Sequence, residues 1–143
     1  MNLIKLSESD IGVILEVQKG FSDGYSENQI KSAFSSGRFH VFLAQENGEN
    51  AGFICFSVAM DESDIETVFV KSEFRRRGVA KSLIKKAESF LLDLAVKKVF
   101  LEVRENNIPA KSLYQDLGYN KISVRKGYYS DGENATIMAK ELL

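Results

Sequence analysis

The chain has 143 residues, of which 44% are hydrophobic and 27% are charged, a size and balance typical of one globular domain. Its formal net charge of −1 argues against a dedicated nucleic-acid binder, because such proteins carry a basic excess. The single cysteine and the single histidine exclude a disulfide-stapled secreted scaffold and a Cys/His zinc site.

The chain carries no internal repeat, low-complexity tract or linker-like segment, so we expect residues 1–143 to form a single domain. Lys5, Glu8 and Asp10 leave no apolar stretch of signal-peptide length near the start. The apolar runs are also far shorter than the ~20 residues that cross a bilayer. We therefore expect a cytoplasmic protein that does not enter membranes.

The first part of the chain alternates between strand and helix patterns. A short strand is expected over 2–6, and the cluster Ser7-Glu8-Ser9-Asp10 begins a helix that continues over 11–17. Residues 20–26 indicate a loop. Ser26 then begins a second helix, which Gly37 ends.

Strand patterns follow. Residues 39–44 and 51–59 flank a turn that contains Asn47-Gly48, and this dipeptide between two apolar runs indicates a β-hairpin. A third strand is expected over 65–70, after an acidic turn at 61–64.

The clearest helix covers 78–94, and charged residues, Glu88 among them, fall largely outside its apolar stripe. That stripe consists of Val79, Leu83, Ala87, Phe90 and Leu94. A strand over 99–104, a helix over 107–117 and two strands over 119–124 and 135–140 complete the chain. The order of elements predicts an α/β fold in which about four helices cover a long sheet.

The segment Arg75-Arg76-Arg77-Gly78-Val79-Ala80 joins a strand to this helix. Unpaired N–H groups and the helix dipole favour an anion at such a position. Gly78 and Ala80 would let a pyrophosphate approach the backbone, and Arg76, Arg77 and Lys81 would add positive charge. The alternative is a solvated basic face. Cations at a helix N-terminus oppose its dipole, which favours the anion site.

The pattern Arg75-x-x-Gly78-x-Ala80, placed after a strand, resembles the acetyl-CoA pyrophosphate loop of the GNAT N-acetyltransferase superfamily. Residues 101–119 and 124–138 resemble the ribosomal-protein-alanine N-acetyltransferases within it. The resemblance covers roughly the second half of the chain. It implies a mixed, mostly antiparallel sheet of about seven strands, with acetyl-CoA as the cosubstrate and no metal.

The resemblance also implies roles for individual residues. Glu102 matches the general base, Tyr114 the general acid and Asn107 a cofactor contact. Tyr128 and Tyr129 would line the acceptor groove, and Arg125 and Glu133 could also meet the acceptor. The cofactor-binding segments would be the strand Val68, Phe69 and Val70, for pantetheine, and the loop Arg76, Arg77, Gly78, Val79, Ala80 and Lys81, for the pyrophosphate.

These residue types suit the chemistry. An α-amine with a pKa near ~8 must lose a proton before it attacks a thioester, and a carboxylate can take that proton. A phenol can protonate the thiolate that leaves. Structural alternatives remain for each residue: Glu102 could pair with Arg104 on the same side of its strand, and Tyr114 could be a helix-core tyrosine. Tyr128 and Tyr129 could simply pack a turn.

The acceptor favoured by the resemblance is a protein N-terminal amine, the N-terminal alanine of a ribosomal protein in particular. Residues 21–26 lack the Pro-Trp pair often found in that family at this place, which leaves the acceptor open. A lysine, a polyamine or another small amine is the first alternative. The second is a non-catalytic acyl-CoA-binding module, which would need the phosphate loop but neither Glu102 nor Tyr114. Oligomeric state and acyl-chain length stay open.

Overall fold

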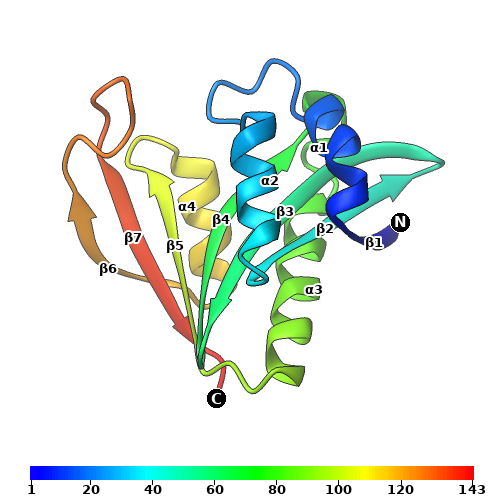
Figure 1. Ribbon diagram of the computed structural model, residues 1–143. Helices are drawn as coiled ribbons and strands as arrows, with labels where there is room; N and C mark the ends of the chain where they lie inside the picture. The colour runs from blue at the N-terminus through cyan, green and yellow to red at the C-terminus, as the bar shows by residue number, and fades with distance from the viewer.

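The computed structural model describes residues 1–143, in which seven strands form one sheet in the order β1-β2-β3-β4-β5-β7-β6 (Figure 1). Every neighbouring pair is antiparallel except β4 with β5, which confirms the predicted mostly antiparallel sheet. The strands are β1 (Asn2–Leu6), β2 (Phe39–Glu46), β3 (Glu49–Ala59), β4 (Glu62–Val70), β5 (Lys98–Arg104), β6 (Asn120–Arg125) and β7 (Ala135–Glu141).

Helices cover both faces of the sheet and bury two separate apolar clusters (Figure 1). The helices are α1 (Ile11–Val17), α2 (Glu27–Ser35), α3 (Val79–Asp93) and α4 (Ile108–Asp116). On one face, Ile14 and Ile30 of α1 and α2 pack against Phe53. On the other, Leu83 of α3 and Tyr114 of α4 join the larger cluster. No helix is long and apolar enough to cross a membrane.

Local sequence signals explain several boundaries. Asn47 and Gly48 have φ values of 51° and 79°, the left-handed pair that a tight hairpin turn requires. Ser26 caps α2 by accepting a hydrogen bond from the Gln29 N–H at 3.1 Å. The acidic turn expected at 61–64 was wrong in part, because residues 62–64 belong to β4 and pair with both β3 and β5.

The feature that creates a site is the separation of β4 from β5. Their parallel pairing runs only from Glu62 with Lys98 to Ile65 with Leu101. Beyond it, β4 stays on β3 as far as Val70, whereas β5 stays on β7 as far as Arg104. Glu66 has no partner in the β3–β4 register and forms a bulge there, and bulges bend and twist a strand. The sheet therefore opens at its centre (Figure 1).

Gly52 keeps β4 on the β3 side of this opening. A Cβ atom at Gly52 would lie 2.3 Å from the carbonyl oxygen of Phe69, a distance that no side chain tolerates. The absence of a side chain at Gly52 therefore lets the two backbones approach where β4 has already left β5.

Candidate active site

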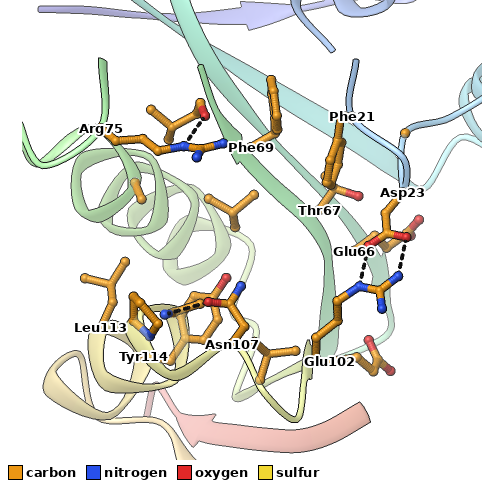
Figure 2. A pocket seen from close by; sticks show the side chains of 18 of the residues that line it. Phe21, Asp23, Glu66, Thr67, Phe69, Arg75, Glu102, Asn107, Leu113 and Tyr114 are labelled. Atoms are coloured by element: carbon orange, nitrogen blue, oxygen red, sulfur yellow. Dashed lines mark hydrogen bonds and ion pairs between the residues drawn. The ribbon is translucent and has the colours of Figure 1, made fainter. Parts of the chain in front are cut away.

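A cavity of about 1420 Å³ occupies the opening between β4 and β5 (Figure 2). It is bordered by the α1–α2 loop (residues 18–26), the β6–β7 loop (residues 126–134), the start of α3 and one side of α4. Its lining includes every residue for which a site role was predicted except Arg77. Those residues are Val68, Phe69, Val70, Arg76, Gly78, Val79, Ala80, Lys81, Glu102, Asn107, Tyr114, Tyr128 and Tyr129.

The loop before α3 is shaped to hold an anion. Arg76 and Gly78 both have left-handed backbone angles, with φ values of 62° and 78°. None of the backbone N–H groups from residue 76 to residue 81 donates a hydrogen bond to a backbone or side-chain acceptor within the protein. These donors and the positive end of the α3 dipole fit the pyrophosphate of a coenzyme A thioester.

Arg77 does not lie where the sequence suggested. Its guanidinium points away from the cavity, lies 3.5 Å from a Glu46 carboxylate oxygen and stacks over the ring of Phe74. The reason is tertiary, since the β2–β3 hairpin brings an opposite charge to this side of the loop. Arg77 can therefore offer its backbone N–H to the cavity, but not its side-chain charge.

The part of β4 beyond residue 65 presents a free edge to the cavity. Because β5 has already separated, the backbone groups of Val68 to Val70 that face β5 have no strand partner. The Arg75 Nε–H donates to the Val70 carbonyl at 3.1 Å and fixes the end of this edge (Figure 2). An extended amide-bearing chain could pair with such an edge as an added strand.

Glu102 points into the cavity from β5 and makes no ion pair with Arg104. Burial raises the pKa of the Glu102 carboxyl, the negative charge of Asp64 raises it further, and Arg125 opposes the shift. The alternative that Glu102 pairs with Arg104 was wrong, because Arg104 binds Asp23, Asp131 and Glu133 instead. The Glu102 carboxylate is therefore free to accept a proton.

Tyr114 is both a core residue and a cavity residue. Its ring packs edge-on against Tyr119 at a centroid distance of 6.2 Å, whereas its side chain also lines the cavity (Figure 2). Its hydroxyl has no hydrogen-bond partner in the protein, and burial raises the Tyr114 pKa to about 12. The phenol therefore stays protonated at neutral pH, with its proton available to a neighbouring group. Asn107 caps α4 by accepting from the Ala110 N–H at 3.2 Å.

The α1–α2 loop supplies cavity residues for which no role was predicted. The buried side chain of Gln18 holds Tyr25 by two hydrogen bonds, to its carbonyl at 2.6 Å and from its N–H at 3.0 Å. The Tyr25 hydroxyl in turn donates to Glu66 at 3.3 Å and accepts from Thr67 at 3.0 Å. The polar composition of the loop was the only sequence signal for these contacts, since their partners in β4 lie about 40 residues away.

Tyr128 and Tyr129 lie at the opposite border of the cavity, in the β6–β7 loop. Their rings pack edge-on with centroids 5.0 Å apart, and the guanidinium of Arg104 stacks 4.1 Å from the centre of the Tyr129 ring. The pair therefore packs a turn and lines the cavity at the same time, which joins the two interpretations of the sequence.

Comparison with known proteins decides the family. Residues 12–119 match the acetyltransferase (GNAT) family. The chain belongs to this family. Its members are acyltransferases that use acetyl-CoA as the cosubstrate, in agreement with the predicted enzyme class and cofactor.

Two curated GNAT relatives act on protein N-termini according to their names. The chain is 40% identical over 79 residues to the N-alpha-acetyltransferase of Saccharolobus solfataricus, a match that covers 54% of this chain and 47% of that enzyme. It is 34% identical over 105 residues to the ribosomal protein bS18-alanine N-acetyltransferase of Escherichia coli, with 71% of each chain covered.

Two solved GNAT structures match over nearly the whole chain. The ribosomal-protein-S18-alanine N-acetyltransferase of Escherichia coli superposes with a TM-score of 0.88 at 29% identity and covers 99% of this chain and 93% of its own. Ard1 of Thermoplasma volcanium superposes with a TM-score of 0.86 at 27% identity and covers 99% and 97%. The predicted fold and the predicted family are therefore both confirmed.

Proposed function

We propose that this GNAT enzyme transfers the acetyl group of acetyl-CoA to the α-amine of a protein N-terminus, with the N-terminal alanine of a ribosomal protein as the favoured acceptor. The names of the relatives from Saccharolobus solfataricus and Escherichia coli support this assignment. It extends from the shared family chemistry to the one acceptor class that these relatives have in common.

The observation that carries the proposal is the division of charge within one cavity. Arg75, Arg76 and Lys81 line the half beside α3, whereas carboxylates line the other half (Figure 2). Those carboxylates belong to Asp23, Asp64, Glu66 and Glu102. A donor that carries phosphates and an acceptor that carries an ammonium group need opposite charges, and the cavity offers them side by side.

Glu102 is the proposed general base. Acetyl-CoA supplies an activated thioester, and its carbonyl carbon can be attacked only by an amine that has lost its proton. The free carboxylate of Glu102 accepts that proton directly or through one water molecule. Its raised pKa makes it a better match to an amine than an ordinary exposed glutamate.

Tyr114 is the proposed general acid, and the free edge of β4 is the proposed oxyanion site. Negative charge develops on the thioester oxygen as the amine attacks, and a backbone N–H among residues 68–70 can stabilise it. The Tyr114 hydroxyl then gives its proton to the departing sulfur. Burial keeps this phenol protonated until that moment.

The test is an acceptor panel read by mass spectrometry. The purified protein is incubated with acetyl-CoA and a peptide that begins with alanine, the same peptide with a blocked N-terminus and an internal lysine, or spermidine. We expect one added acetyl group on the free α-amine and none on the blocked peptide. Turnover of lysine or spermidine alone would replace the proposed acceptor. Binding of acetyl-CoA with no product from any amine would support the non-catalytic module.

A further inference from the structure

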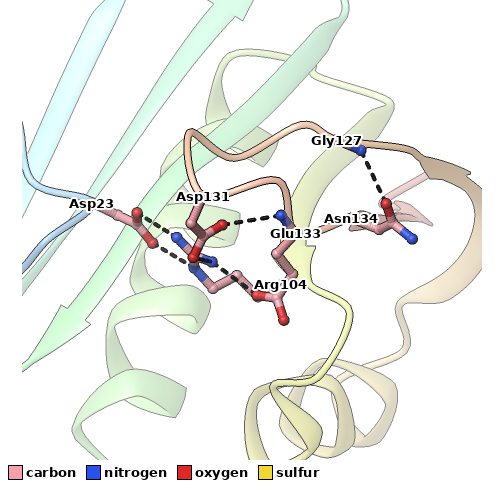
Figure 3. Close-up of polar contacts among 6 residues, drawn as sticks. All are labelled: Asp23, Arg104, Gly127, Asp131, Glu133 and Asn134. Atoms are coloured by element: carbon pink, nitrogen blue, oxygen red, sulfur yellow. Dashed lines mark hydrogen bonds and ion pairs between the residues drawn. The ribbon is translucent and has the colours of Figure 1, made fainter.

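Arg104 connects the two loops that border the carboxylate half of the cavity (Figure 3). Its Nε and Nη2 donate to both carboxylate oxygens of Asp23 in the α1–α2 loop, each at 2.8 Å. Its Nη1 donates to Asp131 and to Glu133 in the β6–β7 loop, each at 2.9 Å. One guanidinium at the end of β5 thus bridges two segments that are far apart in the sequence.

The geometry of this contact requires an arginine. The paired hydrogen bonds to Asp23 use the planar fork of the guanidinium, and the remaining nitrogen serves both acidic residues on the other side. The ring of Tyr129 stacks on the guanidinium at 4.1 Å, which orients its plane. The Arg104 side chain is 22% exposed, so these ion pairs are partly shielded from solvent.

Each loop is held internally by other contacts, but only Arg104 joins one loop to the other. Gln18 fixes Tyr25 within the α1–α2 loop, and the Asn134 side chain accepts from the Gly127 N–H at 3.0 Å within the β6–β7 loop. No other hydrogen bond or ion pair runs between residues 18–26 and residues 126–134. The spacing of the two loops therefore depends on this one side chain.

We propose that Arg104 is a positioning residue that sets the distance between the α1–α2 and β6–β7 loops and thereby determines affinity for the acceptor. Its contacts lie in the carboxylate half of the cavity and none involves the loop before α3. It therefore acts on the acceptor and not on acetyl-CoA. The inference rests on the proposed function only in taking that half as the acceptor side.

Three substitutions test the inference. We expect Arg104→Ala and Arg104→Lys each to raise the acceptor KM about tenfold, because a lysine keeps the charge but cannot form the forked contacts. Asp23→Asn removes the charge of one partner and is expected to give a similar rise. The KM for acetyl-CoA should stay within about twofold for all three, and kcat at saturating acceptor should fall less than the acceptor KM rises.

Controls separate positioning from general loss of stability. Arg38→Ala, which removes an exposed arginine without an ion pair, should leave both KM values unchanged. The double variant Arg104→Ala with Asp23→Asn should raise the acceptor KM no more than either single variant, because both remove the same contact. Added guanidinium ion should partly restore the acceptor KM of Arg104→Ala. If Arg104→Ala does not fold, Arg104→Lys and Asp23→Asn carry the test.

The inference is overturned if Arg104→Lys binds the acceptor as well as the unaltered enzyme, or if the acetyl-CoA KM rises as much as the acceptor KM. These measurements use whichever amine the unaltered enzyme acetylates. Spermidine turnover without peptide turnover would overturn the proposed acceptor and still allow the Arg104 test. Peptide turnover with unaltered KM values in all three variants would overturn the role of Arg104 alone.

Discussion

Phe21 stacks on Phe69, with ring centroids 4.6 Å apart and an angle of 24° between the ring planes. Phe21 belongs to the α1–α2 loop on the carboxylate side of the cavity. Phe69 belongs to the β4 edge, where we propose that the donor binds. The two halves of the cavity thus share a wall, and a change in the loop can reach the donor strand through this stack.

Phe21→Ala should therefore affect both substrates, in contrast to substitutions at Arg104. Loss of the stacked pair is expected to raise both KM values several-fold and to lower the free energy of unfolding by about 1–2 kcal/mol. Steady-state kinetics with each substrate varied in turn and a urea titration measure the two effects. Phe21→Tyr, which keeps the ring, is the matched control. A rise in only one KM would contradict the shared wall.

Glu102→Gln should lower kcat/KM at neutral pH by about a hundredfold or more while the Kd for acetyl-CoA stays the same. The base must be ionised to act, and the pKa of Glu102 is raised. The acidic limb of the pH–rate profile of the unaltered enzyme should therefore lie above the pH of an ordinary glutamate, ~4.3. Calorimetry with acetyl-CoA and a pH–rate series are the measurements. A full rate in the variant would remove Glu102 from the role of base.

The same substitution should stabilise the fold at neutral pH. Because the folded environment raises the Glu102 pKa, its contribution favours folding at low pH and is lost as the pH rises through the folded pKa. At pH 7 the ionised carboxylate opposes folding, and a neutral amide of the same shape does not. We expect a higher Tm for Glu102→Gln at pH 7, with the difference shrinking below about pH 4. An equal or lower Tm at pH 7 would contradict the unpaired, partly buried state of this carboxylate.

Gly78→Asn should weaken acetyl-CoA binding at least about tenfold with little loss of stability. Asparagine tolerates the left-handed backbone angle at this position, and a Cβ atom there meets no protein atom within 4 Å. The side chain would instead occupy the space beside the free N–H groups, where a pyrophosphate has to approach. Gly37→Asn, at a φ of 75° at the end of α2, is the matched control. Equal acetyl-CoA affinity in the two variants would contradict the anion loop.

Tyr119→Phe should destabilise the protein by about 1–2 kcal/mol without changing the KM for either substrate. The Tyr119 hydroxyl donates to Glu88 at 2.8 Å, and Lys140 lies 3.1 Å from the same carboxylate. Removing the hydroxyl leaves a buried acceptor with one partner fewer. Chemical denaturation measures the loss, and Tyr128→Phe, at an exposed tyrosine, should cost little. Unchanged stability of Tyr119→Phe would show that Lys140 alone satisfies Glu88.

Glu88 also shows where sequence pattern stops. Its position on α3 indicated a residue outside the apolar stripe, yet its side chain is buried and bound to Tyr119 and Lys140. Leu94, expected in the stripe, is 47% exposed because α3 ends at Asp93. A helical period predicts the direction of a side chain from the helix axis, but the partner that waits there comes from elsewhere in the chain.

What the sequence determined by itself is local. The Asn47-Gly48 turn, the Ser26 cap and the loop that Gly78 opens each depend on residues within one turn of one another, and all three formed where the pattern indicated. The run from Glu102 to Tyr114 also placed both side chains at the cavity, since a strand end that leads into a helix fixes their relative positions.

Only the tertiary structure decided which charges meet. Arg104 lies two residues from Glu102 on the same side of β5, yet it binds Asp23, which lies 81 residues away. Arg77 turned to Glu46 for the same reason. Side chains pair with the partner that the fold brings within reach in the right orientation. The divergence of β4 from β5, which the bulge at Glu66 accompanies, brings the α1–α2 and β6–β7 loops to the two sides of Arg104.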